Sequence, residues 1–224
     1  MSTAPEDLTG RARLRDAAIE CFAANGFDES LRAIAARAGV TAGLVRHHFG
    51  SKEVLRAECD ATVLDRYQSL KKDSLDTDPA LLFSRFPSSR ENGIILVYIL
   101  RSVRDGGAAG RAFLEGMARE TLAFTLDAVA RGIVVPSRDE EARVRFLINQ
   151  SMGGLIVYFA MRPNTPLDDF QGVMDQYYAD TVLPTLELYT GGLFTDSTYL
   201  DTYLAYAANE NHPPAGLAGE SVSR

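Results

Sequence analysis

The chain has 224 residues, which is long enough for one large domain, or for a small and a medium one, with a proper hydrophobic core. It has no run of about 18 apolar residues and a polar N-terminus, which argues against a membrane span and a signal peptide, so we expect a cytoplasmic protein. The formal net charge of −7 argues at first against a protein that binds nucleic acid.

The first predicted helix covers about Gly10 to Asn25. Its apolar residues recur at helical spacing, and Gly26 follows where a helix commonly ends. Residues 1–9 lack such a stripe, and we expect them to be unstructured. The helix would brace the two helices that follow it.

The segment Ser30–Lys52 has the pattern of two short helices joined by a tight turn. Gly39 ends the first helix, and Thr41 is suited to cap a second helix over Ala42–His48. Two helices that cross steeply need a small side chain where they meet and a residue that tolerates positive φ in the turn, and Ala35 and Gly39 supply them. The segment therefore predicts a helix-turn-helix.

The second helix of this pair is expected to direct one large apolar side chain inward. Val45 would fill the gap between the helices, which leaves small, basic and hydrogen-bonding residues outside. Such a surface suits the major groove of DNA. The outward set is Thr41, Ala42, Leu44, Arg46 and His47.

Charge is unevenly spread along the chain. Residues 1–56 contain eight Lys or Arg and seven Asp or Glu, a balance of +1, and the rest contains 15 basic and 23 acidic residues, a balance of −8. An acidic body that repels phosphate would allow only the N-terminal part to approach DNA. Solubility alone explains the same distribution equally well.

A long helix is predicted over about Lys52–Lys71, with Ser51 as its cap. Lys52 lies in the first turn, where a cation gains nothing from the helix dipole. We expect it to meet an external anion such as a phosphate, with a solvated surface lysine as the alternative. Polar, turn-forming residues at 73–79 predict a loop.

Further helical patterns follow, separated by breaks rich in proline and glycine. They cover about Ala80–Phe86, Arg90–Arg104, Ala108–Ile133, Asp139–Met161 and Leu167–Tyr189, with a short helix at about Ser197–Asn209. Pro184 falls inside the last long pattern and predicts a kink or restart there. No strand pattern occurs, so we expect an all-α fold.

The last two long helices carry apolar stripes suited to packing along other helices. Glycines inside the first of them cost about 1 kcal/mol each relative to alanine, which suggests a close backbone approach. We predict a four-helix interface between two copies, with packing inside one chain as the alternative. The predicted interface residues are Val144, Ile148, Ser151, Gly154, Leu155, Tyr158, Phe170, Val173 and Tyr177.

The middle helices contribute apolar and aromatic residues with few charges among them. Such a set would line an apolar cavity for a drug-sized ligand, although each member alone is more often simply core. The predicted pocket residues are Phe83, Phe86, Tyr98, Phe113, Met117, Phe124, Met152 and Phe159.

Features of an enzyme are lacking. His47 and His48 fall in the outward-facing helix and His212 in the tail, so the body has no histidine for acid–base chemistry or for a metal. No nucleophile, zinc-protease or phosphate-loop motif occurs. We therefore expect no catalytic residue, cofactor or metal, and we interpret Cys21 and Cys59 as buried structural residues rather than a redox pair.

Three segments within residues 11–57 together carry a family resemblance. They are AAIECFAANGFD, RAIAARAGVTAG and HHFGSKEVL, and with them the chain resembles a TetR-type transcriptional regulator. The resemblance implies an all-α homodimer that binds operator DNA and is released when a small molecule binds its C-terminal domain.

The resemblance also implies roles for individual residues. Thr41 should cap the recognition helix and bind a phosphate, Lys52 should bind a phosphate from the next helix, and the residues nearest the groove should be Ala42, Gly43, Leu44 and His47. Most family members have tyrosine where this chain has Arg46, which is able to reach a phosphate or to bond a guanine edge bidentately.

We therefore expect three units: a helix-turn-helix DNA-binding domain at 1–51, a helical effector-binding and dimerisation domain at 52–208, and a disordered tail at 209–224. The partners would be double-stranded operator DNA, a small-molecule effector and a second copy, without a membrane. The alternative is a non-enzymatic helical module whose helix-turn-helix packs or docks to protein. A helical enzyme acting in the apolar body is a more distant third.

Overall fold

The computed structural model describes residues 5–78 and 89–209. Within those ranges every regular element is a helix, which confirms the predicted fold class. The helices are α1 (Pro5–Asn25), α2 (Leu31–Arg37), α3 (Ala42–Phe49), α4 (Lys52–Asp76), α6 (Arg90–Asp105), α7 (Gly107–Ala130), α8 (Glu140–Ala160), α9 (Phe170–Gly191) and α10 (Thr198–Asn209). The predicted helix at Ala80–Phe86 and the tail from residue 210 lie outside the described residues.

Two helix ends differ from the sequence-based prediction. Helix α1 begins at Pro5 rather than near residue 10, so the prediction that 5–9 are unstructured is wrong. Proline is well tolerated in the first turn of a helix, which is compatible with a start at Pro5.

Helix α4 continues to Asp76, five residues past the predicted end, so the predicted loop is wrong for residues 73–76. Arg131, just after α7, donates to the carbonyl oxygen of Leu75 at 3.1 Å and pairs with Asp76 at 2.9 Å. Because this partner is 55 or more residues away, the local sequence could not reveal it. The other helices begin and end within a few residues of the prediction, and α9 continues through Pro184.

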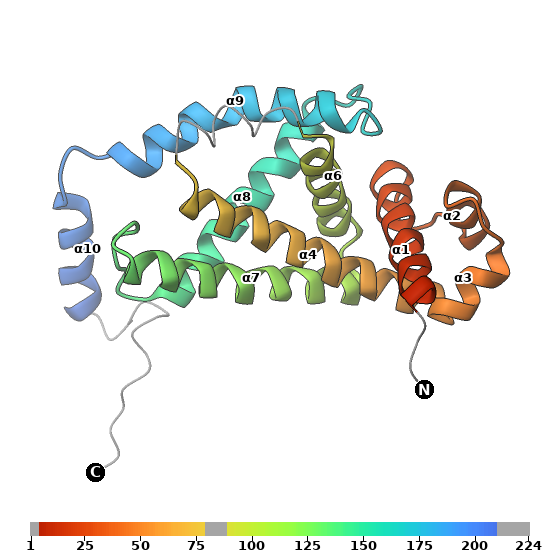
Figure 1. The fold of residues 1–224 in the computed structure, drawn as a ribbon. Coiled ribbons are helices and arrows are strands. Elements are labelled where there is room, and N and C mark those ends of the chain that lie inside the picture. Colours follow the sequence, from red (N-terminus) through yellow and green to blue (C-terminus); the bar gives the residue numbers. More distant parts are fainter. Residues whose placement is uncertain (1–4, 79–88, 210–224) are drawn as a thin grey trace, which may run out of the picture.

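The molecule is elongated, with α1–α3 at one end and α10 at the other (Figure 1). Helices α4 and α7 pack side by side along the body, and α6 lies between α1 and α9. A continuous hydrophobic core connects both parts, from Phe22 and Ile34 in the N-terminal helices to Val97 and Leu155 in the body.

Helix α6 packs unusually close to α9. A Cβ atom added to Gly93 would lie 1.9 Å from the carbonyl oxygen of Phe170, so only glycine permits this distance between the two backbones. On its other side α6 contacts α1, where the guanidinium of Arg101 donates to the carbonyl oxygens of Ala23 and Ala24 at 3.1 and 2.8 Å. Helix α6 therefore connects the N-terminal helices to α9.

Glu20 of α1 links three helices by charge. Its carboxylate accepts hydrogen bonds from Arg90 of α6 at 3.0 Å and from Arg37 of α2 at 2.5 Å. The hydrogen bonds from Arg90 lower the pKa of Glu20 to about 2, with a smaller contribution from Arg37. The carboxylate is therefore ionised at neutral pH, and these contacts orient α2 relative to the body.

Both cysteines are free and buried, as the sequence predicted. Burial raises the pKa of the Cys59 thiol, which makes it unreactive near neutral pH.

In the part of the chain that the structure describes, no group of three acidic, cysteine or histidine side chains is arranged to bind a metal. No described helix is long and apolar enough to cross a membrane.

Candidate nucleic-acid interface

Helices α2 and α3 form the predicted helix-turn-helix. Gly39 in the turn has φ of +69°, and Ala35 is buried where α2 meets the following chain, its carbonyl oxygen accepting from the backbone N–H of Val40 at 2.9 Å. Val45 is 1% exposed and fills the space between the helices. Each of these three roles is as predicted, because each follows from short-range geometry.

Serine or threonine side chains cap all three helices that begin near this surface. The hydroxyl of Thr41 accepts from the backbone N–H of Leu44 at 3.3 Å, that of Ser30 from Ala33 at 3.1 Å, and that of Ser51 from Val54 at 3.3 Å. Such caps fix the entry of each helix and typically stabilise it by about 1 kcal/mol. The N-termini of α2, α3 and α4 are thereby set in place.

The outer surface of α3 is open. Thr41, Gly43, Arg46 and His47 are exposed, Leu44 is 38% exposed, and Ala42 is half-buried. Phe49, at the end of the same helix, is buried beneath the guanidinium of Arg11, whose carbon lies 4.5 Å from the ring centroid. The residues of α3 predicted to contact DNA therefore lie on one surface, and Val45, which was predicted to point inward, lies beneath it together with Phe49.

Arg11 fixes the far end of α3. It donates to the carbonyl oxygen of His48, the penultimate residue of α3, and its Nε donates to Glu58 of α4 at 3.2 Å. One side chain of α1 thus connects α3 to α4, which limits how far the exposed helix is able to rotate on its support.

A shallow hollow of about 810 Å³ opens between the N-termini of α2 and α4 and the side of α3. Three cations border it: Arg32 from the first turn of α2, Arg46 from α3 and Lys52 from the first turn of α4. Backbone N–H groups at helix N-termini attract anions, and the nearby cations add to that attraction. The hollow has the chemistry of a phosphate-binding surface.

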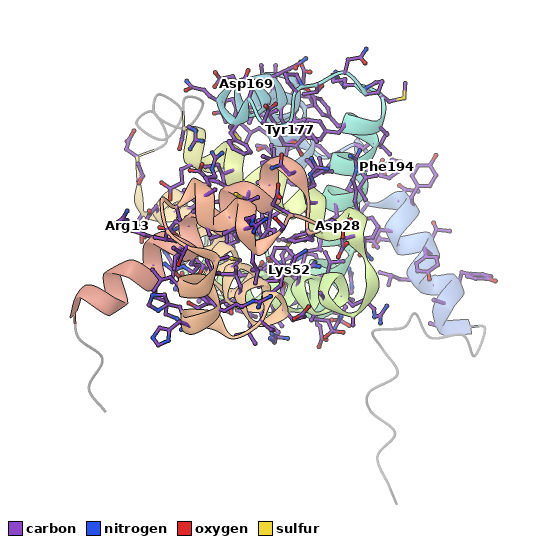
Figure 2. The ribbon with its side chains drawn as sticks, turned by 90° about the vertical axis from the view of Figure 1, so that its right-hand side faces the viewer. Arg13, Asp28, Lys52, Asp169, Tyr177 and Phe194 are labelled. Carbon is purple, nitrogen blue, oxygen red and sulfur yellow. The ribbon has the colours of Figure 1, made fainter. Side chains whose placement is uncertain are left out.

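Figure 2 views the molecule from the end that carries this surface, with Lys52 near its centre. Arg32 and Ser30 border the same hollow and were not among the residues predicted to contact DNA. The signal was present, because Arg32 is a cation in the first turn of a helix, where it gains nothing from the dipole. Lys52 was predicted to bind a phosphate for this reason.

The structure corrects the choice of face for the predicted dimer interface. Val144, Ile148, Leu155, Phe170 and Val173 are at most 9% exposed because they pack in their own chain. Those five side chains are therefore core and leave no surface for a partner. Ser151 and Gly154 are exposed, and Tyr158 and Tyr177 are half-buried.

The predicted pocket residues that the structure describes lie in separate neighbourhoods. Tyr98 packs against Phe113 with ring centroids 6.2 Å apart, whereas Phe159 stacks on Tyr177. Phe124 instead lies by Lys71. Met117 is buried, Met152 is half-buried, and Phe83 and Phe86 are outside the described residues. Tyr98, Phe113, Met117 and Phe159 belong to the hydrophobic core and Met152 packs against it, whereas Phe124 lines a surface pocket between α4 and α7.

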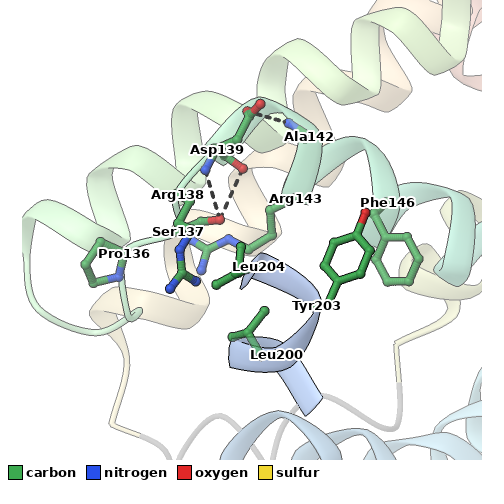
Figure 3. A pocket seen from close by; sticks show the side chains of 10 residues that line it. All are labelled: Pro136, Ser137, Arg138, Asp139, Ala142, Arg143, Phe146, Leu200, Tyr203 and Leu204. Carbon is green, nitrogen blue, oxygen red and sulfur yellow. Dashed lines mark hydrogen bonds between the residues drawn. The ribbon is translucent and has the colours of Figure 1, made fainter. Parts of the chain in front are cut away.

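A second hollow of about 830 Å³ lies at the opposite end of the body (Figure 3). It is bordered by Phe146 of α8 and by Leu200, Tyr203 and Leu204 of α10, with Arg138 from the loop before α8. None of these residues was predicted to form a site.

The arrangement defines a helix-turn-helix unit that presents one capped, basic helix surface at the end of a helical body. Residues 14–59 match the family model described as bacterial regulatory proteins of the tetR family, and residues 91–195 match the one described as the tetracyclin repressor-like C-terminal domain.

The chain is 40% identical over 202 residues to the HTH-type transcriptional regulatory protein RaaS of Mycobacterium tuberculosis, covering 90% of this chain and 94% of that protein. The structure is similar to a TetR-family transcriptional regulator from Rhodococcus sp., with a TM-score of 0.51 at 17% identity, covering 76% of this chain and 96% of that one. The chain belongs to the TetR family of transcriptional regulators, which are DNA-binding proteins rather than enzymes.

Proposed function

We propose that this protein is a cytoplasmic homodimeric repressor that binds a two-fold symmetric operator and is released from it by a small-molecule effector. The observation that carries the proposal is the open surface of α3, flanked by the capped N-termini of α2 and α4 and by Arg32, Arg46 and Lys52. Its relative of 40% identity is also a transcriptional regulator.

Contacts to DNA divide into two kinds on this surface. Arg32 and Lys52 are placed to bind phosphate oxygens, together with backbone N–H groups at the helix N-termini, and such contacts orient a protein on the duplex. Gly43, Leu44 and His47 are exposed on α3 and would approach base edges in the major groove. Arg46 lies between the two groups.

A second copy would cover the exposed face of α8. Phe146, Val157 and Met161 are 66%, 60% and 76% exposed, which is unusual for large apolar side chains on a monomer. A Cβ atom added to Gly153 or Gly154 would meet nothing within 4 Å in its own chain. If these glycines serve a close backbone approach, the approaching helix belongs to a partner.

The apolar surface continues onto α9 and α10. Leu183 and Tyr189 in the second half of α9, and Tyr199 and Tyr206 on α10, are each more than half exposed. In Figure 2, α10 stands out from the body on the side where α8 lies, and Phe194 points away from the body. A partner packed on α8 would therefore also meet α9 and α10.

Helix α4 is the proposed route from effector to DNA. The guanidinium of Arg56 in its second turn lies 3.6 Å from the ring centroid of Phe27, which is in the turn between α1 and α2. Arg56 also pairs with Asp105 of α6 at 2.7 Å. One turn later, Asp60 accepts from the buried hydroxyl of Tyr98 at 2.6 Å. A shift of α4 against α6 would thus move the unit that carries α3 and change the spacing of the two recognition helices.

The dimeric part of the proposal is tested with the Gly154→Leu variant. A leucine there would obstruct the facing helix of a partner without overlapping anything in its own chain, since the position is open. We expect sedimentation velocity to show that Gly154→Leu is a monomer and that the wild type is a dimer. The wild type should bind a duplex selected from a randomised pool with two chains per duplex.

The same variant should lose most of its affinity for that duplex while keeping its helical circular-dichroism spectrum. The control is Gly191→Ala, at an equally open position at the end of α9, which should remain dimeric. A Gly154→Leu protein that stays dimeric, or a wild type that binds the selected duplex as a single chain, would contradict the proposed arrangement.

A further inference from the structure

Lys71 is a half-buried cation on the side of α4 that faces α7. Its Nζ donates to Thr121 Oγ1 at 3.2 Å and lies 4.6 Å from the ring centroid of Tyr67 and 5.5 Å from that of Phe124. Thr121 itself is buried, and Thr125 donates to its carbonyl oxygen at 2.8 Å. Every one of these partners is neutral.

Partly buried arginines elsewhere in the body contact carboxylates. Arg56 pairs with Asp105 at 2.7 Å, Arg162 with Asp180 at 3.1 Å and Arg143 with Glu140 at 2.5 Å. Among the residues that the structure describes, Lys71 contacts no carboxylate. Withdrawal of a charge from water is costly unless an opposite charge compensates it, so this position is favourable for an anion.

The surroundings of Lys71 are aromatic. Tyr67 of α4 lies near Tyr177 of α9, whose pKa is raised by burial and, to a smaller extent, by the Tyr67 phenol. Tyr177 in turn contacts Tyr158 and Phe159 of α8, with ring centroids 5.1 and 6.2 Å away. Rings from α4, α8 and α9 thus occur together on the inner side of α4, and Phe124 of α7 lies next to Lys71.

A shallow surface pocket of about 360 Å³ between α4 and α7 adjoins this region at Phe124. Its charged lining residues are Lys72, Asp76, Asp127 and Arg131, and Lys71 itself lies behind Phe124 rather than in the lining. Phe124 lines the pocket together with Gln68 and Leu75, and Phe124 is also one of the two rings beside the Lys71 ammonium. A flat apolar molecule that entered along Phe124 would bring a substituent close to Lys71.

We propose that Lys71 is the anion-binding residue of the effector site and that the effector is a largely aromatic or apolar molecule with one acidic group. The inference rests on the proposed function, since it assigns a chemical class to the effector. The acidic group would accept hydrogen bonds from Lys71 and from the Thr121 hydroxyl, while Tyr67 and Phe124 contact the apolar part.

This position would also couple the effector to DNA. Lys71 and Lys52 are on the same helix, about 29 Å apart along its axis at 1.5 Å per residue. A ligand that pulls the Lys71 end of α4 toward α7 would shift the whole helix and with it the phosphate-binding end. By linkage, operator DNA must then weaken ligand binding by the same factor.

The test uses two fluorescent probes with the same aromatic frame. 8-Anilinonaphthalene-1-sulfonate carries an acidic group, and N-phenyl-1-naphthylamine lacks it. Titrated into the DNA-free dimer, the sulfonate should bind at least tenfold tighter than the neutral probe. Lys71→Met should remove that preference by weakening only the sulfonate at least tenfold, which is about 1.4 kcal/mol. Lys71→Arg should retain the preference.

Lys72→Met is the competing variant, because Lys72 is the adjacent, exposed lysine and lines the shallow pocket, so it tests whether any nearby cation supplies the preference. It should leave the binding of both probes within about twofold, and melting curves of all variants establish that they are folded. Equal binding of the two probes to the wild type, or a loss of sulfonate binding in Lys72→Met but not in Lys71→Met, would overturn the inference.

Binding of the operator by the probe-free proteins is measured separately. Lys71→Met should bind the selected duplex like the wild type. A protein that shows the Lys71-dependent preference for the sulfonate but does not bind DNA would refute the proposed function and leave the anion site intact. A protein that binds DNA but shows no Lys71-dependent preference for the sulfonate would refute the anion site and leave the proposed function intact.

Discussion

Replacement of Arg46 by alanine is expected to weaken binding of the dimer to its selected duplex by about 30- to 20,000-fold, because a guanidinium that contacts a base edge or phosphate contributes about 1–3 kcal/mol and occurs twice in the dimer. Arg46 is exposed on α3 and borders the hollow between the helix N-termini. Binding is measured by fluorescence anisotropy at a fixed salt concentration.

The control for this variant is Arg138→Ala. Arg138 is also an exposed arginine, but it lies in the loop before α8, at the far end of the body from α1–α3. Its removal changes the net charge identically and should alter affinity by about twofold or less, as expected of a charge beyond the screening length. Unchanged binding by a folded Arg46→Ala dimer would instead favour a helix-turn-helix that only packs or docks to protein.

The Arg46→Ala variant also distinguishes a phosphate contact from a base contact. If Arg46 binds phosphate, the slope of log affinity against log salt should fall in magnitude by about two, one unit for each protomer. If it bonds a guanine edge, the slope should stay nearly constant and discrimination at that base pair should relax.

Replacement of Gly93 by alanine is expected to destabilise the protein by about 3 kcal/mol or more, at the upper end of the cost of overpacking a core. The added Cβ would lie 1.9 Å from the carbonyl oxygen and 2.6 Å from the carbonyl carbon of Phe170, which are backbone atoms and are not able to rotate away. Helices α6 and α9 would have to separate. The melting temperature should fall by about 6–12 °C or more.

Gly191→Ala makes the same chemical change where a Cβ meets nothing within 4 Å, and its stability should stay within about 0.5 kcal/mol of the wild type. Thermal unfolding followed by circular dichroism compares the two. A Gly93→Ala protein that melts like Gly191→Ala would show that the backbones of α6 and α9 are not in close contact at Gly93.

The helix-turn-helix could be predicted in detail because its signals are local. Thr41 and Ser51 are caps, Gly39 has the positive φ of the turn, and Val45 is the buried residue of α3, all as the sequence indicated. Each role depends on chain neighbours within a few residues. Arg32 was missed only because the dipole argument was applied to α4 and not to α2.

The faces of the body helices could not be chosen in the same way. A stripe such as Val144, Ile148 and Leu155 indicates that a helix packs on something, but not whether the neighbour belongs to the same chain. The structure buries that stripe inside the chain and exposes Phe146 and Val157 on the other side of α8. Because α8 has apolar residues on two faces, the difference between its apolar and polar positions is too weak in the sequence to identify the buried face.

The proposed effector site was the least predictable part. Its predicted members were chosen as apolar residues, and several of them, such as Tyr98 and Phe113, are ordinary core. Lys71 was not predicted to be a site residue, since a lysine near the end of a helix is usually solvated. Its significance depends on Thr121 and Phe124, about 50 residues away, and therefore appears only in the folded chain.

In the proposed complex, a two-fold pair of the α3 surfaces binds duplex DNA through phosphate contacts from α2 and α4 as well as through bases. The most direct test is the salt dependence of wild-type binding to the selected duplex. With about 6–10 phosphates neutralised by the dimer, log affinity should fall linearly with log salt with a slope of roughly −5 to −9, a loss of about 10³–10⁵ in affinity between 50 and 200 mM. An affinity that does not change with salt would contradict the proposed complex.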